Sequence, residues 1–99
     1  MAVDWPMTFW RDGFSHLGQM RDLSKTGFFL ISPEVQTIGA RLAITFSFPR
    51  NGGEEERSFI GEAIVVRHET GQDSGMGCRF FRTTQTGLAT VEAFLARRR

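Results

Sequence analysis

The sequence predicts a mainly β fold, in which five or six short antiparallel strands form a small barrel or a strongly curled sheet and one amphipathic helix follows. Short runs that alternate apolar and polar residues recur as far as Phe81. Glycine, proline, asparagine and aspartate residues that favour turns separate these runs. Apolar residues take up helical spacing only near the C-terminus. A chain of 99 residues has room for one core, so we expect a single domain over residues 1–99.

Six runs are candidates for the strands. They cover residues 7–12, 14–20, 28–31, 41–48, 58–69 and 75–81. Asp12-Gly13 is a favoured dipeptide for the turn of the first hairpin, and Gly18 is expected to mark a bulge in the second strand. Pro33 ends the third strand because it has no backbone N–H to donate. Residues 49–56 are expected to form a polar loop.

A helix is predicted over about residues 85–97. Four apolar side chains recur at helical spacing and give the helix one apolar face: Leu88, Val91, Phe94 and Leu95. Three threonine hydroxyls are available to cap its N-terminus: Thr83, Thr84 and Thr86. The arginines at 97–99 suit the C-terminal end of the helix, where the last carbonyl groups favour positive charge.

The composition excludes several classes of protein. A net charge of +1 gives no general attraction to nucleic acid or to anionic membranes. No run reaches the roughly 20 apolar residues of a membrane-spanning helix, and the N-terminus lacks the pattern of a signal peptide. A single cysteine excludes an internal disulfide framework and favours a reducing compartment. We therefore expect a cytoplasmic protein without membrane insertion.

The chain carries no evident catalytic or metal-binding group of residues. His16 and His68 fall in different predicted strands without ligand spacing, so no metal site is predicted. Cys78 alternates with Met76 and Phe80 and is expected to pack inward, so no catalytic residue and no enzyme activity are predicted. Binding of a nucleic-acid polymer is disfavoured because the phenylalanines fall on core-facing positions. A barrel that binds single strands is the least favoured alternative.

The segment from Arg21 to Ile31 stands out as a candidate binding site. Within it Asp22, Ser24 and Gly27 are spaced as Asp-x-Ser-x-x-Gly, directly before an apolar run. Aspartate and serine bond to nearby backbone and favour turns, and glycine permits the close approach of another group. The residues alone are compatible with two interpretations. One is an ordinary turn, and the other is a bend that presents a carboxylate and a hydroxyl to a polar ligand.

Four blocks of sequence follow one another along most of the chain. They are residues 20–29 with the Asp-x-Ser-x-x-Gly motif, Ile38-Gly39, the strand 61–67 that echoes Gly-x-x-Val-x-Arg, and the Gly-x-Gly-x-x-Phe strand 75–80. This order resembles the PilZ domain family, the bacterial receptor modules for cyclic di-GMP. The resemblance implies a six-stranded antiparallel β-barrel with a C-terminal α-helix. It implies no cofactor, and cyclic di-GMP is the ligand to be considered.

The resemblance also implies a nucleotide site at Arg21, Asp22, Ser24 and Gly27. In it, Asp22 would accept from the guanine N–H edge, Ser24 would add a hydroxyl contact and Gly27 would let the backbone turn beneath the base. Family members that bind the nucleotide also carry an Arg-x-x-x-Arg segment well before this motif, which supplies donors to phosphate and guanine. The arginines before Asp22 here are Arg11 and Arg21, which lack that spacing. The segment is missing, lay in a longer parent chain or is supplied by another chain.

Two hypotheses follow from the resemblance. The first is a PilZ-type signalling module or adaptor that acts through protein contacts, with weak or absent intrinsic affinity for cyclic di-GMP. Its implied partners belong to motility, type IV pilus or exopolysaccharide machinery. The alternative is a genuine cyclic di-GMP receptor in which Arg11, Arg21 or Arg79 replaces the missing arginines.

Overall fold

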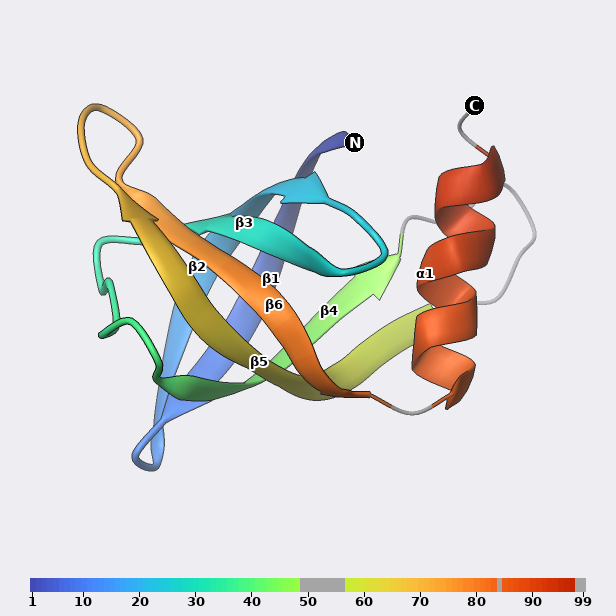
Figure 1. Cartoon of the computed structure of the whole chain (residues 1–99), viewed down its shortest axis with the longest axis horizontal. Coiled ribbons are helices and arrows are strands. Elements are labelled where there is room, and N and C mark those ends of the chain that lie inside the picture. Colours follow the sequence, from blue (N-terminus) through green and yellow to red (C-terminus); the bar gives the residue numbers. More distant parts are fainter. Residues whose placement is uncertain (49–56, 84, 98–99) are drawn as a thin grey trace.

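The computed structural model describes residues 1–48, 57–83 and 85–97. Six strands and one helix follow one another along the chain (Figure 1). They are β1 (Ala2–Arg11), β2 (Phe14–Leu23), β3 (Gly27–Ile31), β4 (Arg41–Phe48), β5 (Arg57–Glu69), β6 (Gly75–Thr83) and α1 (Gln85–Arg97). The predicted loop at 49–56, the cap at Thr84 and the arginines at 98–99 lie outside the described residues.

The six strands form a closed antiparallel barrel in the order β1-β2-β3-β6-β5-β4. Each half of the chain makes a three-stranded meander, and the two halves join where β3 pairs with β6 and where β4 pairs with β1. Closure gives every strand a partner on both sides, so the backbone hydrogen bonds of the sheet are satisfied around the barrel. The predicted fold class, a six-stranded antiparallel barrel with a C-terminal helix, is confirmed.

Alternating apolar side chains fill the barrel. Four side chains of β4 are buried, as the sequence predicts: Leu42, Ile44, Phe46 and Phe48. The rings of Phe46 and Phe59 stack with their centroids 4.9 Å apart, and Phe59 lies 5.1 Å from Phe80 on β6. Aromatic contacts of this kind stabilise beyond the area they bury. The phenylalanine-rich composition therefore serves the core, as expected from the strand positions of these residues.

The helix α1 covers one end of the barrel, beside the end of β4 (Figure 1). Val91 is fully buried, and the ring of Phe94 meets Trp5 edge-to-face at 4.9 Å and Phe48 at 5.6 Å. The apolar face predicted from the sequence is thus the face that packs on the barrel. Among the described residues, no helix is both long enough and apolar enough to cross a membrane.

The first two strands are longer than their sequence patterns indicate. β1 begins at Ala2 rather than at Met7, and β2 continues to Leu23 rather than ending at Met20. Backbone pairing extends both strands beyond the residues whose side chains alternate cleanly. The extension carries β2 into the segment that contains the Asp-x-Ser-x-x-Gly motif.

The expected bulge at Gly18 is wrong. The pairing of β1 with β2 runs without a shift from Trp5 to Arg11, and Gly18 pairs regularly with Met7. A β-carbon at Gly18 would collide with the side chain of Leu30, so the glycine leaves room for a core residue. The bulge in β2 lies further along the strand, where it shapes the candidate site.

Candidate functional site

A bulge in β2 turns Arg21 and Asp22 outward together. In the pairing of β2 with β3, these two residues lie opposite a single residue of β3. Met20 and Leu23, on either side of them, are both buried. In a regular strand Asp22 would share the inward face of Met20, because alternate residues point to the same side. The bulge therefore brings the Asp22 carboxylate to the surface.

Ser24 holds the turn between β2 and β3. Its Oγ accepts hydrogen bonds from the backbone N–H groups of Thr26 at 3.3 Å and Gly27 at 3.2 Å. The backbone N–H of Ser24 donates to the Gly27 carbonyl oxygen at 2.9 Å. These contacts satisfy backbone groups within the turn, as serine side chains commonly do. The interpretation as an ordinary turn accounts for Ser24 without a ligand.

Gly27 brings β3 close to β6. It pairs with Arg79, and a β-carbon at residue 27 would collide with the carbonyl oxygen of Cys78. Its φ angle is not in the left-handed region that favours glycine. Glycine is thus required at this position for the close approach of two backbones rather than for an unusual dihedral angle.

A hollow of about 310 Å³ lies beside this turn, between residues of β2, β3, β5 and β6. Of the four predicted site residues, Asp22, Ser24 and Gly27 line the hollow, and Arg21 does not. Its volume is at the low end of the range of about 300–1,000 Å³ that is typical of small-molecule sites. The motif residues therefore gather at one concave surface, with Asp22 as their exposed ionisable group.

Arg21 is held by two carboxylates. Its Nε lies 3.2 Å from Asp22 Oδ2, and its Nη2 lies 3.1 Å from Glu69 Oε2 on β5. The guanidinium carbon lies 4.1 Å from the centre of the Phe29 ring, within cation–π range. Partial desolvation lowers the pKa of Arg21, but the hydrogen bonds to Asp22 and Glu69 outweigh it and raise that pKa above its usual value. The Arg21 guanidinium is therefore already paired with the carboxylates of Asp22 and Glu69.

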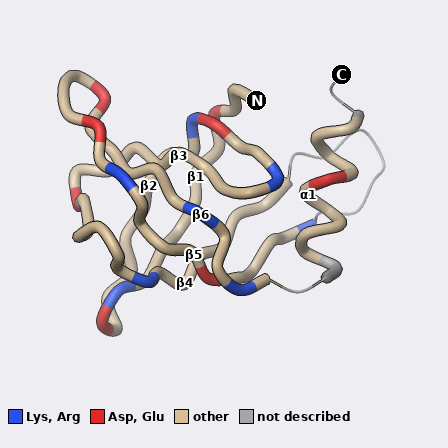
Figure 2. The backbone as a smooth tube through the Cα atoms, in the orientation of Figure 1, with Lys and Arg blue, Asp and Glu red and all other residues tan. Residues whose placement is uncertain are grey.

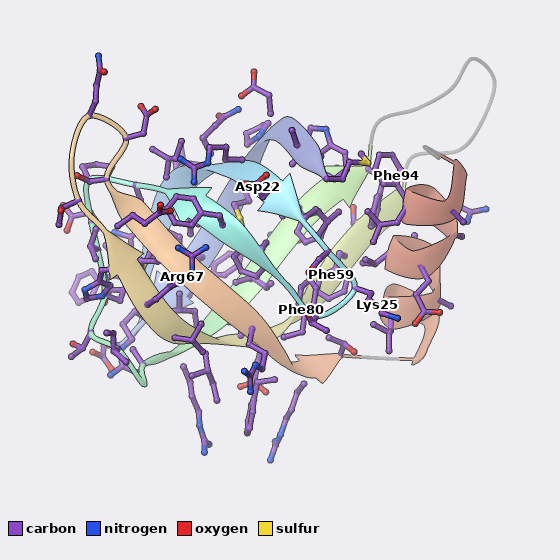
Figure 3. The ribbon with its side chains drawn as sticks, turned by 45° about the horizontal axis from the view of Figure 1, so that its top comes forward. Asp22, Lys25, Phe59, Arg67, Phe80 and Phe94 are labelled. Carbon is purple, nitrogen blue, oxygen red and sulfur yellow. The ribbon has the colours of Figure 1, made fainter. Side chains whose placement is uncertain are left out.

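Arg67 is a further cation at the site, and it lines the hollow. Figure 3 shows its side chain lying over β6, with Asp22 near the end of β2. Its Nη1 lies 3.2 Å from Glu69 Oε2, and its guanidinium carbon lies 5.2 Å from the centre of the Phe29 ring. A β-carbon at Gly77 would come within 2.7 Å of Arg67 Cγ and Nε. The absence of a side chain at residue 77 therefore makes room for Arg67.

Comparisons with known proteins identify the family. The family model for the PilZ domain matches residues 2–97. The chain belongs to the PilZ family. PilZ domains are non-catalytic receptor modules of cyclic di-GMP signalling.

A solved structure described as the Bacillus subtilis inhibitor of motility (MotI/DgrA) superposes on this PilZ chain with a TM-score of 0.86 and 14% sequence identity. The match covers 99% of this chain and 48% of that chain, so this chain spans about half the length of that relative. At this level of identity the likeness shows the fold. No curated protein sequence matches the chain.

Within this PilZ barrel, the arginines considered as replacements lie in different places. Arg79 lines the hollow, and its guanidinium has no ion pair with another described residue. Arg11 lies beside the β1–β2 turn, where its Nη1 donates to the Arg41 carbonyl oxygen at 3.4 Å, and it does not line the hollow. Sequence reasoning overlooked Arg67, although it ends the Gly-x-x-Val-x-Arg block. The β5–β6 register, which pairs Arg67 with Gly77, is a property of the folded barrel and shows that Arg67 belongs to the site.

The remaining chemistry of the PilZ site is limited. Cys78 is among the residues that line the hollow, but its side chain is buried, and burial raises the pKa of the thiol to about 12, which keeps it protonated and poorly nucleophilic near neutral pH. Among the described residues, no group of three or more His, Cys, Asp and Glu side chains is arranged to hold a metal ion. The His68 side chain contacts the segment after β3, with its Nε2 at 2.6 Å from the Gln36 carbonyl oxygen.

Proposed function

We propose that this chain is a cytoplasmic cyclic di-GMP signalling module that acts through protein–protein contacts and has weak intrinsic affinity for the nucleotide. The observation that carries this proposal is the ion pairing beside the hollow. Arg21 and Arg67 both form ion pairs with Glu69, so of the two arginines that line the hollow, Arg67 and Arg79, Arg79 alone has no ion pair with another described residue. Cyclic di-GMP carries two phosphates, and phosphate binding depends on cations that are free to donate.

Asp22 is the residue best placed to recognise a base. Its carboxylate lines the hollow with 51% of the side chain exposed, and it can accept from the N–H groups of a guanine edge. Ser24 already uses its hydroxyl in the turn, so its contribution is to hold the turn that follows Asp22. Each missing charge-assisted hydrogen bond to phosphate weakens binding by about 1.5–3 kcal/mol, which is a factor of roughly ten or more in affinity. Because Asp22 can contact the base while few cations are free to contact the phosphates, we expect weak binding of cyclic di-GMP.

An uncharged outer face supports action through protein contacts. The strand registers place four residues in one row across the barrel: Leu17, Thr8, Thr45 and Ile60. Leu17 and Ile60 at the two ends of the row are 76% and 71% exposed. The middles of β1, β2 and β4 contain no Lys, Arg, Asp or Glu and are tan in Figure 2. Exposed apolar side chains on such a face are typical of docking surfaces.

The partner that we propose is a protein of motility, type IV pilus or exopolysaccharide machinery. The family resemblance supports this class of partner, and the solved relative is described as an inhibitor of motility. A rigid closed barrel can present its outer face and its helix to such a partner without chemistry of its own.

Titration calorimetry with cyclic di-GMP tests the proposal on the chain as it stands. We expect a dissociation constant no tighter than micromolar, and an Asp22→Ala variant that loses the residual binding because the guanine N–H edge then has no side-chain acceptor at residue 22. A sub-micromolar dissociation constant for the unmodified chain would overturn the proposal of weak affinity.

A genuine receptor is the second candidate. The observation that favours it is the presence of Arg67 and Arg79 around the hollow that contains Asp22. In this case Asp22→Ala and Arg21→Ala would each abolish cyclic di-GMP-dependent shifts in an NMR titration. If the unmodified chain shows no shifts at millimolar ligand, this candidate fails. Salt-sensitive retention on an oligonucleotide column would instead support the least favoured function, binding of single-stranded nucleic acid.

A further inference from the structure

Glu69 joins two arginines: Arg67, which lines the hollow, and Arg21, whose guanidinium contacts Asp22 and Phe29 beside it. Its Oε2 atom lies 3.1 Å from Nη2 of Arg21 on β2 and 3.2 Å from Nη1 of Arg67 on β5. Residues 21 and 69 are 48 positions apart in sequence, so the barrel rather than local spacing brings them together. One carboxylate oxygen therefore accepts a hydrogen bond from Arg21 and forms an ion pair with Arg67.

The ring of Phe29 lies beneath both guanidinium groups. Phe29 is itself 2% exposed and lines the hollow. A shift in the β5–β6 register between Val65 and Arg67 accompanies the outward position of Arg67, and Gly77 leaves space for its side chain. Arg67 thus belongs to the lining of the hollow, and Arg21 lies against two residues that line it, Asp22 and Phe29.

The charges within this group cancel. Asp22 and Glu69 supply two negative charges, and Arg21 and Arg67 supply two positive charges. A phosphate that enters the hollow must compete with Glu69 for both guanidinium groups, and it also meets the field of the Asp22 carboxylate. If Glu69 were neutral, the same group would carry a net charge of +1 and its arginines would be free to donate.

We propose that Glu69 sets the affinity of this site for anionic guanine nucleotides by occupying Arg21 and Arg67. This inference rests on the proposed function, since it takes the hollow beside Asp22 as the nucleotide site. Glu69 is a positioning residue that controls which cations are available, and it does not contact the ligand itself.

The test replaces Glu69 with its uncharged isostere and titrates cyclic di-GMP by calorimetry at low ionic strength. Glu69→Gln is expected to bind about tenfold more tightly than the unmodified chain, because at least one charge-assisted contact to phosphate becomes available. Glu62→Gln is the matched control. Glu62 has 42% side-chain exposure against 44% for Glu69, and it faces Arg82 at 4.0 Å rather than the hollow. We expect its affinity to stay within about twofold of the unmodified chain.

A double variant shows whether the gain comes through the arginines. Arg67→Ala combined with Glu69→Gln should lose most of the tenfold gain, and addition of salt should reduce the affinity of Glu69→Gln more than that of the double variant. Equal affinity of Glu69→Gln and the unmodified chain, weaker binding by Glu69→Gln, or no binding by it at millimolar ligand would each overturn the inference. The proposed function is judged separately, by the absolute dissociation constant of the unmodified chain.

Discussion

The backbone of Gly27 lies against the carbonyl oxygen of Cys78, with no space between them for a side chain. This contact joins β3 to β6, which is one of the two seams where the halves of the barrel meet. The last residue of the Asp-x-Ser-x-x-Gly motif is therefore part of the closure of the barrel as well as of the hollow. A motif that is read as a binding signature also has a structural function here.

Gly27→Ala is expected to destabilise the fold by about 2–3 kcal/mol, because the added methyl group collides with backbone that cannot move without opening the β3–β6 pairing. Urea denaturation measures the change. Gly77→Ala is the control, since the three atoms nearest to its β-carbon all belong to the flexible side chain of Arg67, and it should cost under about 1 kcal/mol. Equal losses for the two variants would contradict the assignment of Gly27 to the seam.

Ser24→Ala should cost about 1 kcal/mol of unfolding free energy, because the backbone N–H groups of Thr26 and Gly27 lose their acceptor. The same denaturation experiment on Ser47→Ala provides the comparison. The Ser47 hydroxyl lies on the exposed outer face and makes one long contact, 3.4 Å from Ser58 Oγ, so its loss should change stability by less than about 0.5 kcal/mol. A stable Ser24→Ala variant would show that the turn does not depend on this hydroxyl.

The stability of the fold should decrease as the pH rises above about 9. Burial raises the pKa of Cys78 from 9.0 to about 12, so the folded state keeps the thiol proton while the unfolded state loses it. The unfolded state then binds fewer protons, and the stability contribution present below pH 9 is lost between pH 9 and pH 12. The sequence contains no tyrosine, so no phenol titrates in this window. Urea midpoints measured across it should fall, and those of Cys78→Ala should fall much less.

Phe94→Ala should loosen the contact between α1 and the barrel and cost about 2 kcal/mol, because the half-buried ring loses its contacts with Trp5 and Phe48. The fluorescence of Trp5 should shift to longer wavelength as its ring becomes more exposed to water. Phe14→Ala removes a phenylalanine that is 71% exposed and should leave both stability and fluorescence nearly unchanged. An unaltered emission spectrum in Phe94→Ala would argue against this docking contact.

The fold class could be predicted because it depends on patterns that are local in sequence. Alternation over residues 41–48 requires one buried face whatever its neighbours are, and the structure buries Leu42 and Ile44 as expected. The helical spacing that includes Val91 likewise requires a packed face. Strand ends were less predictable, since β1 and β2 extend through backbone pairing that side-chain alternation does not record.

Part of the candidate site was also visible in the sequence. The spacing of Asp22, Ser24 and Gly27 indicated a turn with an exposed carboxylate, and these residues do line one hollow. The sequence placed the bulge at Gly18 instead of Arg21, because glycine is the usual local sign of a bulge. The register of β2 against β3 decides where the extra residue falls, and that register is a property of two strands.

The sequence by itself determined the alternating strands, the helix and the motif turn, because alternation, helical spacing and turn chemistry each act over a few neighbouring residues. These patterns left a barrel and a strongly curled sheet open, and the family resemblance implied the six-stranded barrel. The tertiary structure alone decided that Arg21 and Arg67 share Glu69 over the ring of Phe29. Those contacts require the strand order that sets β6 between β3 and β5, and the bulge adds the Asp22 carboxylate to the same outer surface. Charge pairing across a closed barrel depends on which strands meet and in which register, and no local pattern encodes it.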